Sequence, residues 1–124
     1  MASFTACPAG RGRWSRTFST SELPEITDTL SLDVYVPSPQ PNPYWTGDIQ
    51  AFLSCPSAGL DNAPLGGESL TNLFPNEFNA LAFPLTSAMV GALSASHEDC
   101  SWRLDLNVNQ GAGQFNFDRL GFLD

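Results

Sequence analysis

The segment 101–109 constrains the fold more than any other, because it alternates strictly between apolar and polar side chains. Successive side chains of a β-strand point to opposite faces of its sheet, so this alternation predicts a strand with one buried face. The segment 30–36 shows the same period. The apolar positions of the two segments are Trp102, Leu104, Leu106 and Val108 and then Leu30, Leu32, Val34 and Val36.

Shorter apolar runs complete the pattern. Four prolines within 37–43 end the strand at 30–36 and hold an extended loop, 37–47. A turn-rich loop is expected at 55–69, and a short helix at 86–93, where Thr86 or Ser87 supplies the cap. Further strands are expected at 48–54, 78–85 and 114–122, the last as the hairpin partner of 101–109 across the turn 109–113.

These elements predict one all-β domain over residues 1–124, a jelly-roll-like sandwich of two sheets with one short helix. Ten glycines and ten prolines in 124 residues favour short strands joined by turns over a helical bundle. For residues 1–19 two alternatives are left: a loose N-terminal segment, or a segment with a first strand around 14–18.

The charge balance limits the partners. The chain carries 13 acidic and 5 basic residues, a net charge of -8, and every basic residue is arginine. From residue 20 onward only Arg103 and Arg119 oppose all 13 acidic residues, so the net charge of that part is -11. This excludes a nucleic acid partner and an anionic membrane surface. Membrane insertion is not expected either, because no apolar stretch approaches the roughly 20 residues of a span.

The three cysteines, Cys7, Cys55 and Cys100, allow at most one internal disulfide. Cys55–Cys100 is the pair to test, since both flank expected strands, and three free thiols are the equal alternative. The first residues lack the continuous apolar run of a secretory signal. For an extracellular or cell-surface location, we therefore expect that the chain is a domain of a larger precursor or travels by another route.

Catalytic patterns are weak. The single histidine, His97, lies in a polar stretch, and the pattern Gly-x-Ser-x-Gly does not occur. A pair of Cys100 with His97 is conceivable, but neighbours on a loop do not make a positioned dyad. The carboxylates of Asp33, Asp105 and Asp118 leave a small glycoside-acting enzyme as a minor alternative.

The polar faces of the strands carry a stronger signal. If the strands at 30–36, 48–54, 101–109 and 114–122 share one sheet, planar polar groups and exposed rings form one row on its wet face. Such groups suit a sugar, whose hydroxyls take paired hydrogen bonds and whose C–H face stacks on a ring. Any antiparallel sheet with one wet face shows a similar row, which is the equal alternative. The row comprises Asp33, Tyr35, Gln50, Phe52, Arg103, Asp105, Asn107, Gln114 and Asn116.

The proline-rich loop adds Tyr44 and Trp45 near its end. Because the prolines hold this loop extended, the two rings lose little conformational entropy when they bind a ligand. An indole at a loop rim can stack on a pyranose ring. The competing interpretation is that Trp45 folds inward and covers the edge of the sandwich.

Four segments carry a family resemblance. They are LSLDVYVP at 30–37, FPL at 83–85 followed by the short helix, RLDLNVN at 103–109 and GQFNFDRLGF at 113–122. Over 29–122 they resemble the non-catalytic jelly-roll modules related to carbohydrate-binding modules. The resemblance is to a superfamily and describes the fold more than an activity.

The resemblance implies a lectin-like, secreted module that binds a glycan or polysaccharide on a concave sheet face or at its rim loops. It also implies a structural calcium ion, with Asp118 matching the aspartate of the closing strand. The usual acidic opening strand is not recognisable before Leu23, which argues against that ion. The alternative function is a structural or adhesive domain of a larger protein. The expected ligand-binding residues are Trp45, Tyr44, Tyr35, Asp33, Gln50, Arg103, Asp105 and Asn107.

Overall fold

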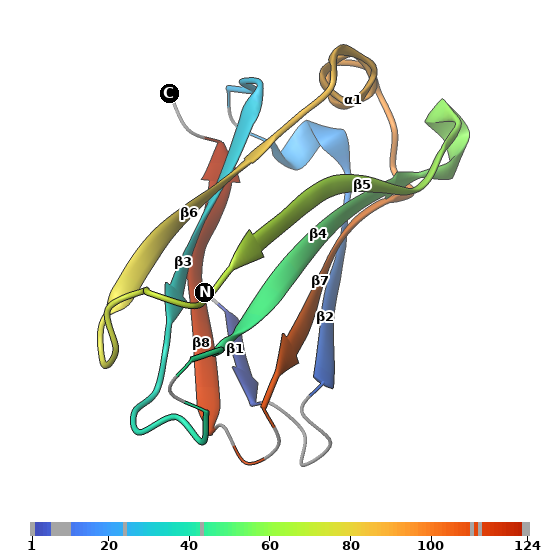
Figure 1. The fold of residues 1–124 in the computed structure, drawn as a ribbon. Helices are drawn as coiled ribbons and strands as arrows, with labels where there is room; N and C mark the ends of the chain where they lie inside the picture. Colours follow the sequence, from blue (N-terminus) through green and yellow to red (C-terminus); the bar gives the residue numbers. More distant parts are fainter. Residues whose placement is uncertain are drawn as a thin grey trace.

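A computed structural model describes residues 2–5, 11–23, 25–42, 44–109, 111 and 113–122 (Figure 1). Two 3-10 helices, η1 (Thr20–Glu22) and η2 (Pro56–Ala58), and one α-helix, α1 (Ser87–Leu93), connect some of the strands. The strands are β1 (Ala2–Thr5), β2 (Arg11–Phe18), β3 (Thr29–Tyr35), β4 (Gly47–Cys55), β5 (Leu60–Ser69), β6 (Phe78–Pro84), β7 (Cys100–Val108) and β8 (Gln114–Phe122).

The strands form two four-stranded sheets with the orders β1-β8-β3-β6 and β2-β7-β4-β5. Each strand of the first half pairs antiparallel with a strand of the second half, β1 with β8, β2 with β7, β3 with β6 and β4 with β5. The pairs β3·β8 and β4·β7 then join this folded ribbon into its two sheets. Such a ribbon is a jelly roll, so the expected all-β jelly-roll-like sandwich with one short helix is confirmed.

The core lies between the two sheets and follows the alternation seen in the sequence. In β3, Leu30, Leu32 and Val34 are at most 1% exposed, while the residues between them are half-buried. The apolar positions of β7 are buried in the same way. Burial of each large side chain contributes about 1.5–3 kcal/mol, and a one-residue slip would turn every one of them outward.

The expectation of a loop over 55–69 is wrong, because residues 60–69 form strand β5. Strand β5 lies at the edge of its sheet, where a proline such as Pro64 costs no ladder hydrogen bond. Its register against β4 shifts twice, and both Asn62 and Gly66 have positive φ angles. The turn-forming residues therefore mark bulges in an edge strand.

The expectation of a hairpin between the strands at 101–109 and 114–122 is also wrong. Strand β7 pairs with β2 and β4, whereas β8 pairs with β1 and β3 in the opposite sheet. The connection between them crosses from one layer to the other, a separation of about 10 Å. Alternation fixes which face of a strand is buried, but both sheets bury the same kind of face.

The expected helix is present as α1, and its first turn is capped by the Thr86 hydroxyl, which accepts from Met89 N at 3.2 Å. Met89 and Leu93 are buried and place α1 over one end of the sandwich (Figure 1). Among the described residues, no helix is long and apolar enough to cross a membrane.

Candidate functional site

The residues expected in one polar row lie on two different faces. Gln50, Phe52, Arg103, Asp105 and Asn107 are on the strands of the β2-β7-β4-β5 sheet. The others are on the opposite sheet, so the assumption of a single shared sheet is wrong, for the same reason as the hairpin. The residues on that opposite sheet are Asp33, Tyr35, Gln114 and Asn116.

On the outer face of the β2-β7-β4-β5 sheet, a shallow cleft of about 560 Å³ is bordered by Gly12, Leu106 and five polar side chains. The ladder sets their order, because Asp48 is opposite Asn107, and Asp105 is opposite both Gln50 and Arg13. Three of the five, Gln50, Asp105 and Asn107, were expected as ligand-binding residues. We call this set the polar patch, which consists of Arg13, Asp48, Gln50, Asp105 and Asn107.

Asp105 is held by two guanidinium groups. Its Oδ1 atom lies 3.0 Å from Arg13 Nε and 3.2 Å from Arg103 Nε. The Arg13 contact is a hydrogen bond, whereas the angle at Arg103 Nε leaves only an ion pair. Arg103 also donates from Nη1 to Asn62 Oδ1 at 2.9 Å, and its guanidinium lies 4.0 Å from the centre of the Phe52 ring. The carboxylate of Asp105 is thus fixed in place, and Phe52 is covered.

The other members of the polar patch have no such partners. Gln50 and Asn107 are exposed and Asp48 is half-buried. Among the described residues, no hydrogen bond or ion pair engages these three side chains, which leaves their planar groups available to a ligand.

Sequence reasoning missed Arg13 and Asp48. Arg13 lies in the first 19 residues, for which the sequence leaves a loose entry and a strand both open, and only the pairing of β2 with β7 places it opposite Asp105. Asp48 is the first polar position of the strand at 48–54, in phase with Gln50, and this spacing was a usable signal.

The outer face of the other sheet carries Asp33 and Tyr35. The Tyr35 ring meets Phe78 edge to face with 5.6 Å between ring centres, and Arg119 Nε lies 3.8 Å from Asp33 Oδ2. Because this face and the polar patch are on opposite sides of the sandwich, Asp33 and Tyr35 do not share a surface with Gln50 and Asp105.

Tyr44 and Trp45 lie in the connection from β3 to β4. Tyr44 is 88% exposed and Trp45 is 37% exposed. The carbonyl oxygen of Trp45 accepts from Asn109 Nδ2 at 2.6 Å, which ties this loop to the residue that follows β7. The loop therefore lies next to the end of the strand that carries Asn107.

The residues around Asp118 were tested against the calcium ion that the resemblance implies. Asp118 is opposite Asp33 in the ladder, and its Oδ1 accepts from Arg119 N at 2.8 Å. Within the described ranges no three acidic, histidine or cysteine side chains gather as a metal site requires. Two carboxylates beside a guanidinium do not fit calcium well. The ion stays a prediction, which melting temperatures with chelator and with millimolar calcium test.

The expected disulfide between Cys55 and Cys100 is present, and the alternative of three free thiols is wrong. Cys55 ends β4 and Cys100 begins the neighbouring β7, so the ladder brings the two together, and both are fully buried. The bond leaves Cys100 unable to serve as a nucleophile beside His97. Cys7 lies outside the described residues.

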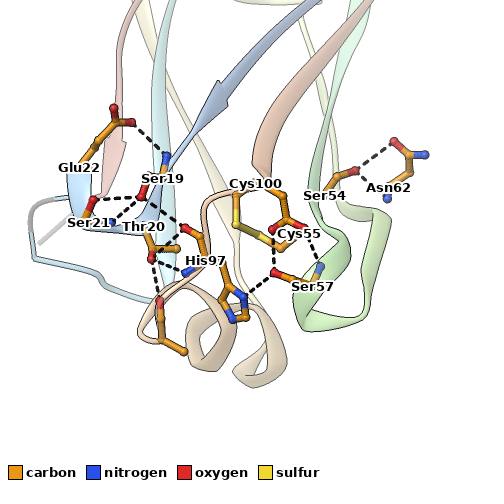
Figure 2. Close-up of a disulfide and its surroundings, with 12 residues drawn as sticks. Ser19, Thr20, Ser21, Glu22, Ser54, Cys55, Ser57, Asn62, His97 and Cys100 are labelled. Atoms are coloured by element: carbon orange, nitrogen blue, oxygen red, sulfur yellow. Dashed lines mark hydrogen bonds between the residues drawn. A yellow bond between two sulfur atoms is a disulfide. The ribbon is translucent and has the colours of Figure 1, made fainter.

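Figure 2 shows Ser57 and His97 facing each other beside this disulfide. The Ser57 Oγ atom lies 2.6 Å from His97 Nδ1 and 2.7 Å from Asp99 Oδ1, and Ser57 N donates to Asp99 Oδ2 at 2.8 Å. The hydroxyl has one proton and a carboxylate only accepts, so that proton goes to Asp99 and His97 Nδ1 donates to Ser57.

This arrangement differs from a hydrolytic triad, in which the acid holds the histidine and the histidine accepts the proton of the serine. Here the acid holds the serine. The Ser57 hydroxyl is the main cause that lowers the pKa of Asp99 below its ordinary value. The three side chains fasten η2 to the segment before β7. Sequence reasoning missed Ser57, because 40 residues separate it from His97.

No model of a known protein family matches the sequence, and no curated protein matches it either. The fold is similar to that of a solved structure described as the structural basis for the promiscuous specificity of carbohydrate-binding modules from the β-sandwich superfamily. The TM-score is 0.55 at 13% sequence identity, and the match covers 92% of this chain and 42% of the other. This chain thus spans less than half the length of that one. This similarity confirms the expected fold.

Proposed function

We propose that this domain binds a glycan at the polar patch without catalysing a reaction on it. The observation that carries the proposal is the presence of three planar side chains, Asp48, Gln50 and Asn107, with no partner among the described residues. They stand on two adjacent strands, spaced about 4.8 Å across the sheet and about 6.8 Å along it. Neighbouring sugar hydroxyls accept and donate the paired hydrogen bonds that such groups offer.

The charges of the patch favour a neutral glycan. Among the side chains that the structure describes there, Arg13 and the neighbouring Arg103 balance the charges of Asp48 and Asp105. The two ion pairs also hold Asp105 in one orientation before a ligand arrives, which reduces the entropy lost on binding.

A stacking surface for the same glycan is supplied by the neighbouring loop. Arg103 covers Phe52, so that ring is not free to stack on a sugar. Tyr44 and Trp45 are exposed, and the bond from Asn109 to the Trp45 carbonyl places their loop beside the end of β7. A glycan of several units can lie on the polar patch and extend to these rings.

Binding without catalysis is supported by the site itself. The Oδ1 atom of Asp105 is already engaged by two guanidinium groups, and the Ser57 cluster has the wrong order for nucleophilic catalysis. Similarity to a carbohydrate-binding module agrees with a binding role. The disulfide supports an extracellular or cell-surface location, where such bonds persist, within a longer protein.

A glycan array followed by calorimetry on the best ligand tests the proposal. We expect Asn107→Ala and Gln50→Ala to weaken binding by roughly 10-fold each, the scale of one or two lost hydrogen bonds. The matched control is Asn116→Ala, which removes an amide from the outer face of the opposite sheet and should leave the affinity unchanged. Absence of any glycan signal, with self-association or binding to a protein instead, would favour the adhesive function.

A further inference from the structure

A second cavity lies between the two sheets, at the edge where β2 faces the last part of β8. Its volume is about 600 Å³, and residues of both layers line it. The reason for the opening is the unequal length of the paired strands. In the described part of the chain, β1 pairs only with Gln114–Phe117, whereas β8 continues to Phe122. Beyond Phe117 the layer opposite β2 is therefore open at this edge.

The floor of this cavity is apolar and its mouth carries a large ring. Trp102, Leu104 and Phe117 line the floor and are 6% exposed or less. Trp14 is opposite Leu104 in the ladder and packs against the core, but it is only half-buried. A ligand between Trp14 and this floor would be shielded from water on two sides.

The charged side chains at the mouth differ in whether they already have hydrogen-bond partners. Among the described residues the acidic ones are engaged by backbone groups, since Glu22 Oε2 accepts from Ser19 N at 3.1 Å and Asp118 Oδ1 accepts from Arg119 N at 2.8 Å. Arg16 is exposed, and within the same described ranges no hydrogen bond or ion pair engages its guanidinium. Arg16 is opposite Trp102 in the ladder, so it stands on the inward side of β2.

The backbone of the rim is also unusual. Arg119 has a φ angle of +54°, in the left-handed region that few non-glycine residues adopt, where β8 bulges against β3. Arg119 borders the same cavity, and its Nε atom lies 3.8 Å from the Oδ2 atom of Asp33. Strained positions of this kind tend to be kept where they place a side chain for binding.

From the apolar floor, the ring of Trp14 and the unused guanidinium of Arg16 we infer that this cavity binds a small ring compound that carries a carboxylate. The ring lies against Trp14 and the carboxylate accepts two hydrogen bonds from the Arg16 fork. An aromatic acid and a uronic acid share this chemistry. The inference does not depend on the polar patch, which lies on the outside of the same sheet.

Tryptophan fluorescence and calorimetry with three probes test it. We expect benzoate, sodium glucuronate or both to bind saturably, and benzyl alcohol, which has a ring and no charge, to bind at least 10-fold more weakly than benzoate. Binding of benzoate alone would indicate an aromatic acid as the ligand, and binding of glucuronate alone would indicate an acidic sugar.

The matched variants lie on opposite sides of one strand. Arg16→Gln should weaken binding of the anion at least 10-fold, whereas Arg13→Gln, on the outer side of β2, should leave it unchanged. Asn107→Ala should not affect it either, so that failure of the glycan proposal and failure of this one are distinguishable. Equal binding of benzyl alcohol, equal binding to Arg16→Gln, or no saturable binding of either anion would overturn the inference. Circular dichroism confirms that each variant is folded.

Discussion

The two ends of the sandwich are held in different ways. At the disulfide end, which comprises residues 19–22, 55–59 and 94–100, the Cys55–Cys100 bond is joined by the Ser57 cluster. Thr20 adds bonds from its backbone N to His97 O at 2.9 Å and from its hydroxyl to Ala95 O at 2.7 Å. This end is fastened by covalent and polar links between segments far apart in the sequence.

The loop end, residues 36–46 and 70–77, lies away from α1 (Figure 1) and carries rings instead. Two backbone amides still join its two loops: Asn76 N donates to Val36 O at 2.8 Å, and Thr46 N donates to the side-chain oxygen Thr71 Oγ1 at 3.0 Å. Residues 36–46 and 70–76 contain no charged side chain. Its exposed large apolar residues are Tyr44, Trp45 and Phe74, and the exposed Phe78 follows as the first residue of β6.

The disulfide end contributes to stability, and the loop end offers exposed side chains for binding. A rigid scaffold that carries exposed side chains on its loops is the usual arrangement for recognition. Here the polar patch and the loop end lie toward the C-terminal end of β7. The disulfide and the polar contacts that resist unfolding lie at its N-terminal end. We therefore expect changes at the disulfide end to alter stability and changes at the loop end to alter binding.

The largest expected effect is the loss of the disulfide. Replacing both Cys55 and Cys100 by serine should lower the free energy of unfolding by about 2–4 kcal/mol, because the bond closes a loop across a sequence separation of 45 and restricts the unfolded chain. Urea unfolding with and without reductant measures it. Reductant should not change the double variant further. Equal midpoints for the oxidised and reduced wild type would contradict the role of this end.

A smaller effect is expected for Trp45→Ala. The side chain is 37% exposed, so it is more covered than free, and its removal should cost about 1–2 kcal/mol, less than the 3–5 kcal/mol of a fully buried tryptophan. Tyr44→Ala is the matched control, since an 88% exposed ring should change the stability by less than about 0.5 kcal/mol.

The same two variants test the loop end as part of the glycan site. If the ring stacks on the sugar, Trp45→Ala should lower the glycan affinity by about 1–3 kcal/mol. Tyr44→Ala should leave the melting temperature nearly unchanged. A loss of 3–5 kcal/mol in stability for Trp45→Ala, with unchanged affinity, would show that this indole only covers the edge of the sandwich.

The sequence predicted most of the segments that form strands and which of their faces are buried, but it did not predict which strands pair with one another. The alternation at 30–36 and 101–109 identified the buried faces of β3 and β7, and Thr86 identified the start of α1. Strand β5 was missed because its glycines and Pro64 are typical of turns, and only its place at a sheet edge permits them.

The site was half predictable for the same reason. The outward position of Gln50, Asp105 and Asn107 followed from the sequence, because a polar residue in phase with a buried face must point outward. Their separation from Asp33 and Tyr35 was not found, because which strands share a sheet depends on the path of the whole ribbon. Contacts such as Arg13 with Asp105, 92 residues apart, have no local signal.

The smallest effect expected is electrostatic and belongs to the disulfide end. The Ser57 hydroxyl is the main cause of the lowered pKa of Asp99, so Ser57→Ala should raise that pKa toward its ordinary value of 3.8. The backbone N–H of residue 57 still donates to Asp99, so part of the lowering should remain. Carboxyl carbon shifts followed by NMR against pH measure the change.

The sign of the matching stability effect follows from linkage. A carboxyl whose pKa is lowered in the folded state stabilises that state above its unfolded pKa, and the contribution is lost as the pH falls through the folded value. The melting temperatures of wild type and Ser57→Ala should therefore differ slightly at pH 7 and converge in acid below the folded pKa of Asp99. Ser54→Ala, whose hydroxyl bonds Asn62 instead, is the control. A difference that grows in acid would contradict the assignment of this effect to Asp99.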